Sequence, residues 1–117
     1  MSDITLEQLR QKIRDFAAAR DWDQFHSPKN LSMAMIVEAA ELVEHFQWLT
    51  EEQSHSLPDD KRDEVENELA DIFLYLIRIA DKLDIDLLNA ANNKIKINAE
   101  KYPADKVRGS AKKYNEY

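Results

Sequence analysis

Two stretches of the chain each carry a pair of acidic residues inside an apolar helical stripe. Glu38 and Glu41 lie three residues apart in the first stretch, and Glu68 and Asp71 repeat that spacing in the second. At about 100° per residue, each pair shares a helical face with apolar or aromatic residues. These neighbours are Leu31, Ala34, Met35, Leu42 and Leu49 in the first stretch, and Ile72, Tyr75 and Ile79 in the second. A carboxylate in such surroundings is costly unless a cation meets it, so the fold must bring positive charge to these pairs.

The two stretches form the most apolar helices of the chain, so we expect them to pack together and their four carboxylates to converge. No matching basic residues stand beside them in the sequence. Oxygen ligands without nitrogen or sulfur favour Mg²⁺, with Mn²⁺ as a substitute. We therefore predict that Glu38, Glu41, Glu68 and Asp71 are both metal ligands and catalytic residues. The alternative is a solvated acidic face, which is the usual meaning of an isolated acidic pair on a helix.

Internal carboxylates are also typical of di-iron bundles, which place Glu-x-x-His on two helices. The three histidines are His26, His45 and His55, and none follows a glutamate of either pair by three residues. The spacing therefore favours an all-oxygen site over a di-iron site.

Turn-forming residues are scarce, with one glycine and three prolines among 117 residues. This argues against a protein built of strands and turns and predicts an all-α fold with four main helices. The length predicts a single domain over residues 1–117. The chain has no cysteine, which excludes disulfides and thiolate chemistry.

Capping signals predict where the four helices begin. Thr5, with Gln8 in a capping box, opens the first helix. Ser27-Pro28 or Asn30 opens the second, which we expect to run to about residue 50. We expect a polar loop over residues 50–57, with Ser56 capping a third helix that runs to about residue 83. Asp84 or Asp86 caps the fourth, from residue 87 to about 101, where Pro103 ends it.

The charge is unevenly distributed along the chain. Residues 1–100 hold 11 basic and 21 acidic residues, giving −10, whereas residues 101–117 hold 5 and 2, giving +3. An acidic body disfavours specific nucleic-acid binding, whereas a small basic tail (residues 103–117) beside acidic metal sites suits a compact polyanion such as a triphosphate. No run approaches membrane-spanning length and the N-terminus lacks signal-peptide features, so we expect a cytoplasmic protein.

Residues 21–28 form a predicted loop rich in aromatic residues, with Trp22, Phe25 and His26 close together. Such a loop either packs into the core or holds a planar ligand, and the sequence alone leaves both open.

The chain contains Glu38-x-x-Glu41 and, after 26 intervening residues, Glu68-x-x-Asp71. This pattern resembles the magnesium-binding signature of the MazG-type all-α nucleoside triphosphate pyrophosphohydrolases. Other parts of the chain are similar to the dCTP pyrophosphatase branch of that family. They are residues 20–26, Pro28, residues 30–31, residues 38–48, Lys94, Asn98, Tyr102-Pro103 and Lys113-Tyr114. The likeness extends from about residue 6 to residue 114.

The resemblance implies a four-helix MazG-like bundle that hydrolyses a (deoxy)nucleoside triphosphate, with a dCTP-like substrate preferred, to the monophosphate and pyrophosphate. It implies a homodimer, or a tetramer of two dimers, with active sites shared between subunits. It places Trp22, Phe25, His26 and Trp48 around the base and sugar, with Tyr75 nearby. It places Lys94, Asn98, Arg108, Ser110, Lys112, Lys113 and Tyr114 at the phosphates, with Tyr102 as a further substrate-binding residue.

The predicted role of such an enzyme is nucleotide house-cleaning. Glu41 is our choice for the carboxylate that orients or deprotonates the attacking water. The alternative from another class is a non-catalytic helical oligomer that serves as a protein-interaction module.

Overall fold

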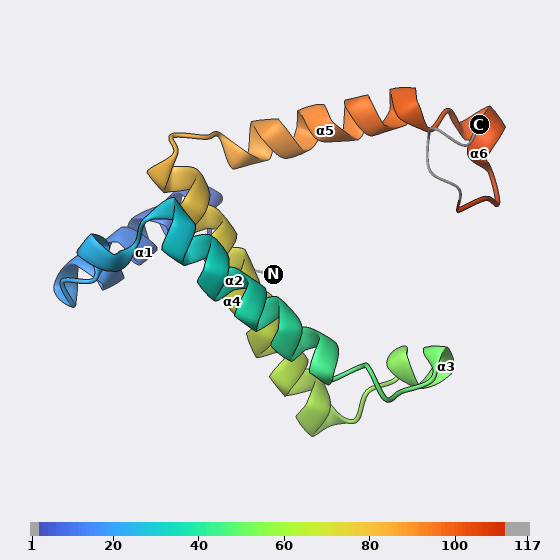
Figure 1. The fold of residues 1–117 in the computed structure, drawn as a ribbon, viewed down its shortest axis with the longest axis horizontal. Helices are drawn as coiled ribbons and strands as arrows, with labels where there is room; N and C mark the ends of the chain where they lie inside the picture. The colour runs from blue at the N-terminus through green and yellow to red at the C-terminus, as the bar shows by residue number, and fades with distance from the viewer. Residues whose placement is uncertain (1–2, 112–117) are drawn as a thin grey trace. The chain divides into compact units, whose positions relative to one another are not determined.

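The computed structural model describes residues 3–111, and all the secondary structure assigned within that range is helical (Figure 1). The long helices are α1 (Leu6–Ala19), α2 (Pro28–Glu44), α4 (Asp59–Lys82) and α5 (Leu87–Lys101). Three short ones lie between or after them: η1 (Asp23–Phe25), α3 (Glu51–Ser54) and α6 (Ala104–Val107). The all-α prediction with four main helices is confirmed.

Local capping explains three of the four long helix starts. The Thr5 hydroxyl accepts from the Gln8 backbone N–H while the Gln8 side chain accepts from the Thr5 N–H, which completes the predicted capping box. Ser27 caps α2 with Pro28 in its first turn, and Asp86 caps α5.

The end of α2 was predicted wrongly, because the helix stops at Glu44 and not near residue 50. Residues 45–49 form tight turns, and Thr50 then begins the separate helix α3 through its own capping box with Gln53. Thr50 takes the extended backbone conformation of a capping residue, so a single helix cannot continue through it. The predicted polar loop over residues 50–57 was wrong in part, because it contains the short helix α3.

The start of α4 was also placed too early. Pro58, not Ser56, occupies the capping position, and it makes no side-chain capping hydrogen bond. A cap at Ser56 would put Leu57 in the first helical turn, but the residue before a proline is disfavoured there.

α2 runs along α4, and α1 packs on α4 as well (Figure 1). The buried hydrophobic residues among those described are Ala17, Leu31, Val65, Ile77 and Ala80. They lie on α1, α2 and α4, so these three helices share one small core. The expectation that the two acid-bearing helices pack together is confirmed.

The chain divides into two compact units, Met1–Asp84 and Ile85–Tyr117. The first holds α1 to α4, and the second holds α5 and α6, described here by itself. No residue of α5 is buried, and its apolar residues Leu88, Ile95 and Ile97 are exposed. The single domain over residues 1–117 stays a prediction.

α2 and α4 each leave a row of large apolar side chains exposed, which we call the exposed apolar faces. They comprise Met33, Ile36, Val37 and Val43 on α2, and Leu69, Phe73 and Leu76 on α4. Ile36 is 63% exposed and Phe73 is 44% exposed, values unusual for side chains of this size at helical spacing. Within residues 3–111, no helix combines the length and the apolar character needed to cross a membrane.

Candidate active site

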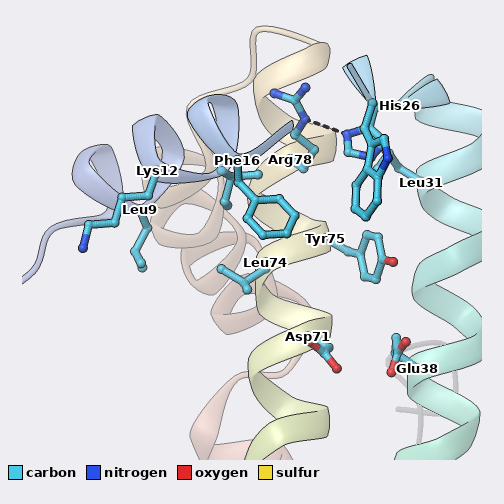
Figure 2. Close-up of a pocket in the computed structure, with 12 residues that line it drawn as sticks. Leu9, Lys12, Phe16, His26, Leu31, Glu38, Asp71, Leu74, Tyr75 and Arg78 are labelled. Carbon is cyan, nitrogen blue, oxygen red and sulfur yellow. Dashed lines mark hydrogen bonds between the residues drawn. The ribbon is translucent and has the colours of Figure 1, made fainter. Parts of the chain in front are cut away.

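Three carboxylates meet between α2 and α4. Glu38 and Glu41 project from consecutive turns of α2, and Glu68 faces them from α4; one oxygen from each lies within 4.8 Å of the other two. Asp71, one turn after Glu68, borders the same cavity as Glu38 (Figure 2). We call Glu38, Glu41 and Glu68 the acid cluster, with Asp71 beside it.

Within residues 3–111, no lysine or arginine forms an ion pair with the acid cluster. A hydrogen bond with Glu68, helped by burial and by the neighbouring Glu41 and Asp71, raises the pKa of Glu38 from 4.5 to about 7. One oxygen of Glu68, Oε2, is buried without a hydrogen-bond partner among the described residues. Carboxylates at close range with no cation beside them resist full ionisation, and the raised pKa of Glu38 is the expected result.

This donor set fits a divalent metal ion. All the groups offer carboxylate oxygen, the ligand that hard cations prefer, and a bound cation would replace the proton on Glu38 and satisfy Glu68 Oε2. A divalent cation would therefore stabilise this arrangement of carboxylates.

His45 lies beside the acid cluster, although the sequence reading gave it no role. Its Nδ1 is 3.5 Å from Glu64 Oε2 and its Nε2 is 3.9 Å from Glu68 Oε1. The ring thus stands at the end of α2, between two glutamates of α4.

A cavity of about 450 Å³ extends from the acidic residues between α2 and α4 toward α1 and the loop before α2. Figure 2 shows Glu38 and Asp71 at one end of it, Tyr75 in the middle, and His26 and Arg78 at the other end. Its remaining lining residues are Leu9, Lys12, Ile13, Phe16, Trp22, Leu31 and Leu74. One end is therefore acidic and the other is mainly apolar and aromatic.

Aromatic rings line the second end. Trp22 packs edge to face against Phe16, with ring centroids 5.7 Å apart, and against His26 at 6.5 Å. Tyr75 lies between the two ends, and burial, with the charges of Glu38 and Asp71, raises the pKa of its hydroxyl. A planar, partly apolar group fits this end of the cavity.

Arg78 holds the loop before α2 in place. It is 5% exposed, and its Nε donates to His26 Nδ1 at 3.2 Å while Nη2 donates to Asp23 Oδ1 at 2.7 Å. Lys82 also hydrogen-bonds Asp23. The Lys82 hydrogen bond, reinforced by Arg78, lowers the pKa of Asp23.

Arg78 was not among the predicted site residues, although its spacing in the sequence could have identified it. Arg78 is the one charged residue in the apolar run from Leu74 to Ala80, and it follows Asp71 by seven residues and Tyr75 by three. That spacing places it on the helical face of the acidic pair. Lys12 and Asp23 were missed too, and neither carries a local signal of this kind.

The other predicted site residues are distributed differently. Phe25 is 59% exposed and Trp48 is 87% exposed, and neither lines the cavity. The second unit holds Lys94, Asn98, Tyr102, Arg108 and Ser110. Lys112, Lys113 and Tyr114 lie outside the described residues. The roles of all these residues stay predictions.

Comparison with known proteins gives a consistent result. The family described as MazG-like matches residues 33–117. The dCTP pyrophosphatase 1 of Mus musculus is 41% identical over 114 residues, covering 96% of this chain and 67% of that protein. The dCTP pyrophosphatase 1 of Homo sapiens is 40% identical over the same shares of the two chains.

A solved structure shows the same likeness. The crystal structure of a pyrophosphatase from Archaeoglobus fulgidus DSM 4304 superposes with a TM-score of 0.80 at 34% identity, covering 88% of this chain and 96% of that one. The relatives found by sequence and the solved structure found by fold are all named as pyrophosphatases.

Proposed function

The chain belongs to the MazG-like family, and from that premise we propose that it is a nucleoside triphosphate pyrophosphohydrolase that cleaves between the α- and β-phosphates. The products are a nucleoside monophosphate and pyrophosphate. One observation carries this function: a single cavity has carboxylates at one end and aromatic side chains at the other. A nucleoside triphosphate has matching ends, a polyanion that needs cations and a planar base that needs stacking partners.

Mg²⁺, with Mn²⁺ as a substitute, is the cation we assign to Glu38, Glu41, Glu68 and Asp71. Bound there, it would neutralise the triphosphate and acidify a water molecule. The support is the all-carboxylate donor set, the raised pKa of Glu38 and the orphaned oxygen of Glu68.

The chain's own residues bind and orient the substrate. Trp22 and His26 hold the base, with Tyr75 beside the sugar between base and phosphates. A carboxylate of the acid cluster, for which we keep Glu41, positions the attacking water and accepts its proton. Attack on the α-phosphorus forms the bond to the water oxygen and breaks the bond to the bridging oxygen, so that pyrophosphate leaves with its electron pair.

The preferred substrate in this proposal is dCTP or a nucleotide like it, and the physiological role is removal of unwanted nucleotides. The support is that several relatives at about 40% identity are dCTP pyrophosphatases. Free nucleotides are cytoplasmic solutes, so we also place the protein in the cytoplasm. Cell fractionation tests that location.

A homodimer, or a tetramer of two dimers, is the assembly we propose. The exposed apolar faces of α2 and α4 support it, because apolar surfaces of this extent usually mark an interface. In such an assembly Phe25 and Trp48 would gain partners. Lys94, Asn98, Tyr102 and the tail residues Arg108, Ser110, Lys112, Lys113 and Tyr114 would complete the phosphate end.

The test is direct. The protein is incubated with dCTP and Mg²⁺, and pyrophosphate release is followed against the other nucleoside triphosphates. Glu38→Gln and Asp71→Asn should remove turnover. Absence of pyrophosphate with every nucleotide would instead favour a non-catalytic helical interaction module.

A further inference from the structure

We infer that Arg78 is a positioning residue that fixes His26 as the tautomer with its proton on Nε2, so that His26 presents a hydrogen-bond donor to the base. This rests on the proposed function, since it assigns His26 to the base end of the nucleotide cavity. It goes further by stating which chemistry that end can recognise.

The direction of the Arg78–His26 hydrogen bond carries the argument. Arg78 Nε lies 3.2 Å from His26 Nδ1, and an arginine Nε always carries a proton, so Arg78 donates and Nδ1 accepts. Nδ1 can accept only when it has no proton of its own. A neutral His26 then keeps its single ring proton on Nε2.

The surroundings hold both residues in this arrangement. Arg78 is buried and bound to Asp23, and its Nη1 lies 3.7 Å from Asp81 Oδ2, so its guanidinium has little freedom to turn. Burial and the charges of Arg78 and Lys82 lower the pKa of His26, which keeps the ring neutral at neutral pH. Both conditions for a single neutral tautomer are therefore met.

The consequence concerns the ligand. With Nδ1 occupied, the remaining polar atom of His26 in the cavity is the donor Nε2–H. A base must therefore present an acceptor, a ring nitrogen or carbonyl oxygen, at this position. An exocyclic amino group there would leave two donors facing each other, which costs free energy once the bound ligand excludes water from them.

A matched pair of variants separates this role from simple loop anchoring. Arg78→Gln keeps an N–H at the position of arginine Nε, whereas Arg78→Met has nearly the same shape without a donor. Both lose the charge and the contact with Asp23. A purely structural Arg78 would make the two variants behave alike.

The first readout is nitrogen NMR of the protein labelled at its three histidines, with His26 assigned by its loss in His26→Gln. We expect one neutral form with the proton on Nε2 in the wild type and in Arg78→Gln. Arg78→Met should show a mixture of the two tautomers. A proton on Nδ1 in the wild type, or an unchanged spectrum in Arg78→Met, overturns the inference.

The second readout is steady-state kinetics with dCTP. If about half of His26 keeps its proton on Nε2 in Arg78→Met, the KM for dCTP should be about twice that of Arg78→Gln, with similar kcat values in the two variants. His26→Phe should raise KM by a smaller factor in Arg78→Met than in the wild type, because part of the Nε2 donor is already lost there. Equal KM values in the Gln and Met variants, or fully additive losses, contradict the inference.

Two analogues test the acceptor itself. Cytosine has two acceptors, and 3-deaza-dCTP removes one while 2-thio-dCTP weakens the other. At least one analogue should bind the wild type worse than dCTP, with the difference lost in Arg78→Met. If the NMR result holds but no nucleotide is turned over, the proposed function fails while the tautomer assignment stands; turnover with the wrong tautomer gives the reverse outcome.

Discussion

Glu38 gives the molecule its clearest expected dependence on pH. Its pKa is about 7 in the folded protein against an ordinary 4.5, so between these values the folded state holds a proton that the unfolded state releases. The free energy of unfolding of the metal-free protein should therefore fall as pH rises from about 4.5 to 7. Urea unfolding across this range measures the effect.

Two comparisons isolate Glu38 as the source. Glu38→Gln should flatten this slope, whereas Glu66→Gln, an exposed change on α4, should retain it. Mg²⁺ should stabilise the wild type more at pH 8 than at pH 6, because metal binding displaces the proton. A slope that survives in Glu38→Gln would show that another group is responsible.

Removing a carboxylate of the acid cluster should abolish metal-dependent turnover. We expect Glu41→Gln and Glu68→Gln each to lower kcat/KM at least about 100-fold, since even groups that only support metal ligands are worth about 10- to 100-fold. Pyrophosphate release measures this, and calorimetry should show weaker Mg²⁺ binding. Glu66→Gln is the matched control, and a similar loss in it would argue against the assignment.

At the scale of single residues, the sequence predicts which side chains share a helical face, because that depends on local spacing. Glu38, Glu41 and Glu68 could be predicted to meet because i,i+3 spacing on apolar faces decides where side chains point. The contacts of Arg78 with His26 and Asp23 could not, since these residues lie 52 and 55 positions away in the sequence. Such contacts depend on how η1 packs against α4, which the apolar periodicity of the sequence does not predict.

At the scale of elements, capping residues should have measurable value. Thr5→Ala removes the acceptor that begins α1 and should lower the free energy of unfolding by about 1 kcal/mol. Thr5→Ser keeps the hydroxyl and should lose much less. Equal losses in the two variants would mean that the Thr5 methyl group matters more than the cap.

The helices themselves were largely predictable, and the errors at the end of α2 and at the start of α4 have separate causes. The start of α1, α2 and α5 follows from side chains that bond within three residues. The end of α2 did not, because apolar residues continue through Leu49 after the helix has stopped. Trp48 and Leu49 are both exposed in the turns that follow, so an apolar residue there indicates neither a helix nor a buried side chain.

At the scale of the whole molecule, the exposed apolar faces predict self-association. Sedimentation or light scattering at micromolar concentration should give a mass of two or four chains. Phe73→Glu and Ile36→Glu, which add a charge to these faces, should shift the mass toward one chain. Ala18→Glu adds the same charge on α1 and should leave the mass unchanged. A monomeric wild type would refute the assembly.

The same two helices, α2 and α4, carry both the acid cluster and the exposed apolar faces. Self-association and catalysis should therefore be coupled, because separating the subunits would also loosen the helices that hold the acid cluster. By mass action, turnover per chain should drop when the protein is diluted below its dissociation constant. The specific activity of such an enzyme would depend on its own concentration in the cell and would be highest where the oligomer predominates.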